Sequence, residues 1–176
     1  MHIEKLKYPI GKCVIPKNIT EDHINKWIDS IASFPINVSK EINNLTPTEL
    51  QYKYRPKGWN IKQVVAHCLD SHINSFIRFK LALTEDNPVI KPYNETEWAN
   101  LEDTLTYPIN DIVIELSYLH RRWVFLLKSM DKKDFNKTFI HPENNNVINL
   151  KENLCIYAWH CTHHLYHIIN AKKYKF

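Results

Sequence analysis

Glycine is scarce in this chain of 176 residues, which contains two glycines, Gly11 and Gly58. An average protein contains about 7% glycine, and β-rich architectures use it in tight turns that need a positive φ angle. The scarcity argues against a fold with many such turns. We therefore expect helices joined by turns of proline and asparagine.

The sequence also lacks long apolar runs and concentrated positive charge. No stretch approaches the roughly 18 apolar residues of a membrane span, and residues 1–12 have no apolar core typical of a signal peptide. The formal net charge is +4, with lysine and arginine scattered along the chain, a pattern that does not follow a phosphate backbone. We expect a cytoplasmic protein that binds neither membranes nor nucleic acid.

Paired cysteines and several common enzyme motifs are missing as well. The four cysteines form no C-x-x-C pair and show no zinc-finger spacing, so we expect unpaired, buried thiols at Cys13, Cys68, Cys155 and Cys161. No phosphate-binding glycine loop, Rossmann fingerprint or nucleophilic serine motif occurs. The sequence therefore gives no support to nucleotide-binding enzymes or serine hydrolases.

Apolar periodicity predicts four long amphipathic helices in one domain that spans residues 1–176. The composition, 44% hydrophobic and 24% charged, is that of an ordinary globular protein. The predicted helices are residues 21–45 with an interruption at Pro35, residues 61–83, residues 112–130 and residues 150–170. Asn60 and Asn149 are the expected N-caps of the second and fourth helices. The pattern is typical of an all-α four-helix bundle.

Shorter signals complete this fold prediction. Thr46 to Glu49 form a capping box that starts a short helical turn. Residues 84–107 form a long crossover, and connections of that length are often functional. Residues 138–140 and 147–150 flank an asparagine-rich turn (144–146) and are predicted to pair as one small β-hairpin.

Histidine, with ten in the chain, is the compositional excess most relevant to chemistry. The last predicted helix carries two pairs spaced i, i+4, and such pairs can converge on one ion. At 100° per residue, His160 and His164 lie about 80° to 120° from the centre of the apolar stripe, at the border of the interior. His163 and His167 lie about 140° to 180° away and are predicted to face water. Packing at the border favours His160 and His164 as ligands. The alternative is that these two are ordinary surface histidines.

A third ligand must come from another helix, and the helix at 61–83 offers His67 and His72. His72 falls within the apolar stripe and is expected to be a hydrogen-bonded core histidine. His67 lies about 140° from the stripe centre, on a polar face that either is solvated or lines a cleft. Periodicity alone therefore does not select His67.

A series of segments, in order along almost the whole chain, resembles the YfiT-like branch of the DinB superfamily. These segments are Lys7–Lys12 (KYPIGK), Tyr54–Trp59 (YRPKGW), His67–His72 (HCLDSH), Ile77–Tyr93, Phe139–Glu143 (FIHPE) and Tyr157–His164 (YAWHCTHH). A resemblance over so much of the chain is more specific than any one motif.

The resemblance implies a DinB-like four-helix bundle, a homodimer, and one divalent metal ion per chain, zinc or nickel, bound by three histidines. The family's ligand positions fall on His67, from the H-x-x-D-S-H segment, and on His160 and His164, from the W-H-x-x-H-H segment. Helical periodicity favours the same pair on the last helix. Three imidazoles leave one coordination position open, as in catalytic zinc sites.

Two enzymatic activities are compatible with this resemblance. Relatives of this kind are named metal-dependent hydrolases, in which the ion activates water, and we expect a hydrolase that acts on a small molecule. The alternative is an S-transferase for a low-molecular-weight thiol such as bacillithiol. A hydrolase needs a general base, for which Asp70 and Glu143 are candidates, and Arg78 could bind the carboxylates of a thiol cofactor. A non-catalytic, metal-stabilised bundle is a third possibility, which the open coordination position disfavours.

Overall fold

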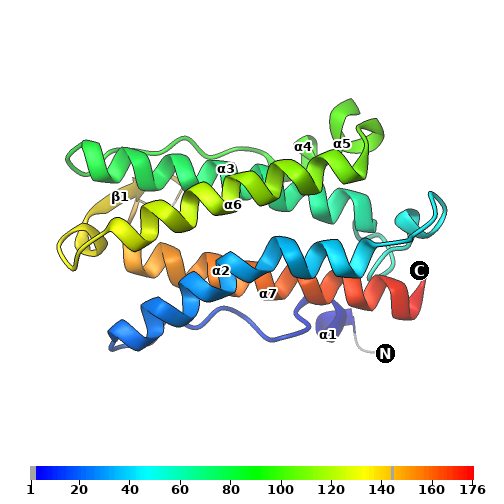
Figure 1. Cartoon of the computed structure of the whole chain (residues 1–176), viewed down its shortest axis with the longest axis horizontal. Helices are drawn as coiled ribbons and strands as arrows, with labels where there is room; N and C mark the ends of the chain where they lie inside the picture. Colours follow the sequence, from blue (N-terminus) through cyan, green and yellow to red (C-terminus); the bar gives the residue numbers. More distant parts are fainter. Residues whose placement is uncertain (1–2, 144) are drawn as a thin grey trace.

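A bundle of four long helices dominates the computed structural model, which describes residues 3–143 and 145–176 (Figure 1). The long helices are α2 (Glu21–Ile42), α3 (Ile61–Thr84), α6 (Ile109–Ser129) and α7 (Leu150–Tyr174). The short elements are α1 (Ile3–Lys7), η1 (Glu49–Gln51), α4 (Glu95–Trp98), α5 (Glu102–Thr106), η2 (Asp134–Asn136), β1 (Thr138–His141) and β2 (Asn146–Asn149). The predicted four-helix bundle with one small hairpin is confirmed.

The order of the helices in space differs from their order along the chain. Helices α2 and α3 each pack against both α6 and α7, so α2 and α3 occupy opposite corners of the bundle (Figure 1). Buried apolar side chains from all four helices form one core cluster, which includes the fully buried rings of Phe34, Phe79 and Trp123. This arrangement places α3 directly beside α7.

Side-chain caps fix where the two helices of the site begin. The Asn60 side chain accepts a hydrogen bond from the Gln63 backbone N–H at 2.8 Å, and the Gln63 side chain accepts from the Asn60 backbone N–H at 3.1 Å. Asn149 and Glu152 form the same reciprocal pair at the start of α7, with distances of 2.9 and 3.1 Å. Both predicted caps are confirmed, and α7 continues past the predicted end at residue 170 to Tyr174.

Helix α2 runs through Pro35 without a break, so the predicted interruption at this residue is wrong. Pro35 is buried, and so are Ile31, Phe34 and Val38 around it, so that packing against the core holds the helix together there. Proline has no N–H, and it therefore cannot pair with the Ile31 carbonyl four residues earlier. That carbonyl instead accepts a hydrogen bond from the Nδ1 of His120 at 2.7 Å.

The long connection after α3 contains structure that the sequence pattern did not predict. It carries the short helices α4 and α5, and both pack against α3. A parallel bridge joins Val89 to Ile140 of β1 and ties the connection to the hairpin. The hairpin itself is antiparallel, as predicted, although Leu150 belongs to α7 rather than to a strand. Asn144, in the predicted turn, lies outside the described residues.

The cysteines are all free thiols, as predicted from their spacing. Cys68, Cys155 and Cys161 are buried, whereas Cys13 is partly exposed and departs from the prediction of burial. Within residues 3–143 and 145–176, every helix is too short or too polar to span a bilayer.

Candidate metal centre

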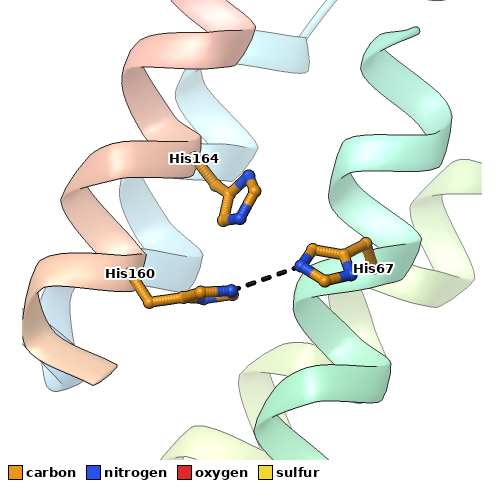
Figure 2. A group of neighbouring side chains, drawn as sticks. All are labelled: His67, His160 and His164. Carbon is orange, nitrogen blue, oxygen red and sulfur yellow. Dashed lines mark hydrogen bonds between the residues drawn. The ribbon is translucent and has the colours of Figure 1, made fainter. Parts of the chain in front are cut away.

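Three histidine side chains converge where α3 and α7 lie side by side (Figure 2). His67 comes from α3, and His160 and His164 come from successive turns of α7. One nitrogen of each ring lies within 4.8 Å of the others. The structure thus brings together the three residues that the family resemblance assigns as ligands.

The spacing of these nitrogens suits a small divalent ion. The Nε2 atoms of His67 and His160 are 3.2 Å apart. Zinc–nitrogen bonds of about 2.0–2.1 Å in tetrahedral geometry place two ligand nitrogens about 3.3 Å apart. The donor set therefore fits zinc, and imidazole nitrogen suits nickel as well.

Burial keeps the three imidazoles uncharged, which is the state that can bind a metal. Desolvation, followed by the nearby His163, lowers the pKa of His67 to about 4. Burial also lowers the pKa values of His160 and His164 well below their ordinary value, and neighbouring histidines add to this effect. Each ring thus keeps a lone pair free for coordination near neutral pH.

His67 is buried rather than on a solvated face. Its side chain is only 3% exposed, because the Trp59 ring packs on it with centroids 4.7 Å apart and α4 lies alongside. Of the two interpretations that the periodicity of α3 left open, burial of His67 excludes the solvated face.

His163 and His167 are buried, so the prediction that they face water is wrong. Their side of α7 is covered by the N-terminal segment, whose Tyr8 ring lies 6.0 Å from the His163 ring. The Tyr54 ring stacks on His167 at 3.8 Å. Helical periodicity assumes that the face opposite the core is solvated, and here other segments of the chain cover it.

Glu95 of α4 is the acidic residue closest to this centre, and the sequence patterns did not identify it. Its Oε2 lies 3.9 Å from the Nε2 of His67. Burial and the charge of Glu143 raise the pKa of Glu95. One sequence signal could have pointed to Glu95. It directly follows Asn94, which caps α4 within a long connection that was expected to be functional.

The two carboxylates predicted as candidate bases lie in different places. Glu143 shares with Tyr93 and Glu95 an open cavity of about 430 Å³ that residues 92–96 line. Asp70 instead lines a separate cavity of about 280 Å³ with Asp103 and Glu115. The structure therefore groups Glu143, but not Asp70, with Glu95.

The helical bundle and its histidine centre define a class of protein, and comparison with known proteins identifies the family. The chain belongs to the DinB superfamily, whose family model matches residues 37–168. It is 46% identical over 168 residues to a protein of Bacillus cereus (strain 03BB102) named "Putative metal-dependent hydrolase", with 96% of each chain covered. A Bacillus thuringiensis subsp. konkukian (strain 97-27) protein with a name of the same kind matches with the same identity and coverage.

Solved structures agree with this assignment. YfiT from Bacillus subtilis, described as "a probable metal-dependent hydrolase with an unusual four-helix bundle topology", superposes with a TM-score of 0.93 at 37% identity. The match covers 96% of this chain and 97% of YfiT, which confirms the resemblance to the YfiT branch. A mycothiol-dependent maleylpyruvate isomerase matches with a TM-score of 0.66 at 12% identity, over 85% of this chain and 63% of the isomerase. This second likeness shows the fold alone.

Proposed function

We propose that the chain is a metal-dependent hydrolase in which His67, His160 and His164 bind one divalent ion, zinc or nickel. The observation that carries the proposal is the convergence of three uncharged imidazole nitrogens at a separation suited to such an ion. The names of the relatives support the same activity. An ion with one open coordination position lowers the pKa of a water bound there to about 7.

The open cavity lined by Glu95, whose carboxylate lies 3.9 Å from His67, supplies groups for a small-molecule substrate. Glu95 is placed to accept a proton, and its raised pKa brings the carboxylate closer to the neutral range in which a general base works best. Tyr93 lines the same cavity. Burial raises the pKa of its phenol, which therefore stays protonated and can donate a hydrogen bond to a polar group of the substrate.

The test combines metal analysis with a turnover assay. Elemental analysis should find about one zinc or nickel ion per chain, and the loaded protein should hydrolyse members of a panel of esters and amides. His160→Ala and His164→Ala should lose both the ion and turnover, whereas His163→Ala should keep both. Full metal content in the first two variants with loss in the third would mean that the ion is held by a different group of histidines.

Thiol transfer is the alternative, and a second panel of thiols with electrophiles tests it. Arg78, the candidate for binding a thiol cofactor, is half-buried on α3 about three turns beyond His67, and the likeness to the mycothiol-dependent isomerase extends only to the fold. Turnover that requires both a thiol and an electrophile would contradict hydrolysis. A fully loaded protein without turnover on either panel would make the metal a purely structural part of the bundle.

A further inference from the structure

Two chains of hydrogen-bonded histidines lead away from the candidate metal centre, and each ends on a backbone carbonyl. The first chain begins at the Ile31 carbonyl, whose helical partner is missing because of Pro35. The His120 Nδ1 lies 2.7 Å from this oxygen. A carbonyl can only accept, so His120 carries its proton on Nδ1. Burial lowers the pKa of His120 to about 4, and the uncharged ring therefore has a lone pair on Nε2.

The direction of this first bond fixes every later bond in the chain. The His72 Nδ1 lies 2.7 Å from the His120 Nε2 and must donate to it. The uncharged His72 then has a lone pair on Nε2, which lies 3.0 Å from the His160 Nδ1. His160 must donate through Nδ1. Its Nε2, the atom 3.2 Å from His67, is therefore left with a free lone pair.

The second chain is shorter and starts at the end of α1. The Lys7 carbonyl belongs to the last residue of that helix, where carbonyls have no intrahelical partner, and it accepts from the His167 Nε2 at 3.1 Å. The His167 Nδ1 then has the lone pair, and it lies 3.3 Å from the His164 Nδ1. His164 donates through Nδ1 and keeps the lone pair on its own Nε2. Both histidines of α7 thus reach the same tautomer by independent routes.

We propose that His72, His120 and His167 are positioning residues that hold His160 and His164 in the Nδ1–H tautomer, with each Nε2 lone pair available for the metal ion. The proton of a histidine ring is located by the hydrogen bond that its other nitrogen makes. Partners of this kind typically change metal affinity by about 10- to 100-fold. The inference rests on the proposed metal site and explains why histidines outside the ligand set are buried around it.

The same inference assigns a role to a second group of close histidines. His163, His164 and His167 also offer nitrogens within 4.8 Å of one another, which suggests a second ion. In the second chain, however, the facing nitrogens of His164 and His167 share a proton and are not free to bind an ion. His163 belongs to neither chain, and among the described residues its buried Nδ1 has no hydrogen-bond partner. We therefore expect one ion per chain, not two.

The experiment measures tautomers directly and affinity in variants. In ¹⁵N-histidine NMR spectra of the zinc-loaded protein, His160 and His164 should be bound through Nε2 and protonated on Nδ1. His72 and His120 should be protonated on Nδ1, and His167 on Nε2. Because these spectra need no substitution, they decide the matter even where a variant fails to fold. Opposite protonation of His120 or His167, or coordination of His160 through Nδ1, would overturn the proposal.

Competition with a chromophoric chelator gives the second readout. Zinc affinity should fall about 10- to 100-fold in His72→Phe and in His167→Phe, whereas His163→Phe, the matched control on α7, should stay within about twofold of the unmodified protein. Pro35→Ala adds an N–H that competes with His120 for the Ile31 carbonyl, so it should weaken zinc binding without loosening the fold. Unchanged affinity in the His72 and His167 variants, or two ions per chain, would contradict the proposal. Failure of the unmodified protein to bind zinc would instead remove the metal site itself.

Discussion

Among the described residues, six histidines are buried in this bundle, and at the scale of single residues their surroundings determine their chemistry. They are His67, His72, His120, His163, His164 and His167. A buried polar ring is costly unless its nitrogens find partners, and here most of the partners are other histidines. Apart from His163, these rings belong to two hydrogen-bonded groups of histidines inside an apolar core, and Glu95 from α4 lies beside His67.

The carboxylate of Glu95 gives the first prediction. Glu95→Gln keeps the shape of the side chain but cannot accept a proton, so hydrolysis should fall by about 10²- to 10⁴-fold, the usual contribution of a general base. Metal content should stay at about one ion per chain. The measurement is kcat on the best ester or amide substrate, and Glu97→Gln on the same short helix is the matched control. Loss of the ion in Glu95→Gln would show that Glu95 is a ligand.

The candidate ligand residues were more predictable than the residues around them. Spacing on one helix finds two i, i+4 pairs, and the apolar stripe favours His160 and His164 because they lie at its border; both signals depend on local structure alone. Selecting His67 required the family resemblance, since a polar helix face looks the same whether it is solvated or lines a cleft. Glu95 escaped prediction because its position depends on how the connection between α3 and α6 folds back against α3.

At the scale of elements, α7 is the helix on which the centre depends, since it carries two of the three candidate ligands. Its start is fixed by Asn149, whose side chain accepts from the Glu152 backbone N–H at 2.9 Å. Helix α3 is fixed in the same way by Asn60. The caps set where each helix begins and therefore which residues face each other across the α3–α7 contact.

Removing the cap of α7 gives the second prediction. Asn149→Ala should lower the free energy of unfolding by about 1 kcal/mol, within the range of about 0.5–2 kcal/mol measured for such caps. Urea denaturation of the metal-free protein measures this change. Asn170→Ala, near the other end of α7, is the control and should change stability much less. Equal losses in the two variants would mean that the cap contributes nothing specific.

The sequence predicted where the long helices lie, but it did not predict what covers their outer faces. The apolar periodicity and the caps of α3 and α7 are local, so their boundaries could be predicted to within a few residues. Pro35 was expected to break α2 because a proline removes one helical hydrogen bond. The break does not occur because Ile31, Phe34 and Val38 are anchored in the core and because a side chain from α6 satisfies the carbonyl left unpaired.

At the scale of the whole molecule, the buried histidines make the fold sensitive to acid. Burial lowers the pKa of His120 to about 4 and the pKa of His167 to about 3, whereas an unfolded histidine titrates near 6.5. Protons therefore bind the unfolded chain more strongly. The stability of the fold should be greatest above pH 6.5 and should decline as the pH falls from 6.5 towards 4.

This loss of stability towards low pH gives the third prediction. For the metal-free protein, the urea midpoint should fall steadily between pH 6.5 and pH 4, because each histidine that protonates only on unfolding contributes up to about 1.4 kcal/mol per pH unit. His120→Gln removes one such group. The free energy of unfolding should then decline less steeply with falling pH, by the equivalent of about one proton taken up on unfolding. A midpoint that stays constant over this range would show that the rings are charged in the folded state.

The oligomeric state gives the fourth prediction. The family resemblance implies a homodimer, so light scattering should find twice the chain mass of 21.0 kDa. The exposed apolar side chains of Ile114, Tyr118 and Phe125 on α6 are candidates for such a contact. Phe125→Glu should shift the protein towards the monomer if this face is used. The same charge at Val14, exposed and outside the bundle helices, is the control.

The contact between Lys7 and His167 joins segments 160 residues apart, and this separation governs when the centre can form during synthesis. Until translation reaches residues 160–164, the nascent chain has His67 but not the other two candidate ligands, and the residue that orients His164 follows three positions later, at His167. A chain that ends before residue 164 therefore cannot capture an ion with the full set of imidazoles. Contacts between segments so distant in sequence form late and slowly, so metal uptake should report the final stage of folding.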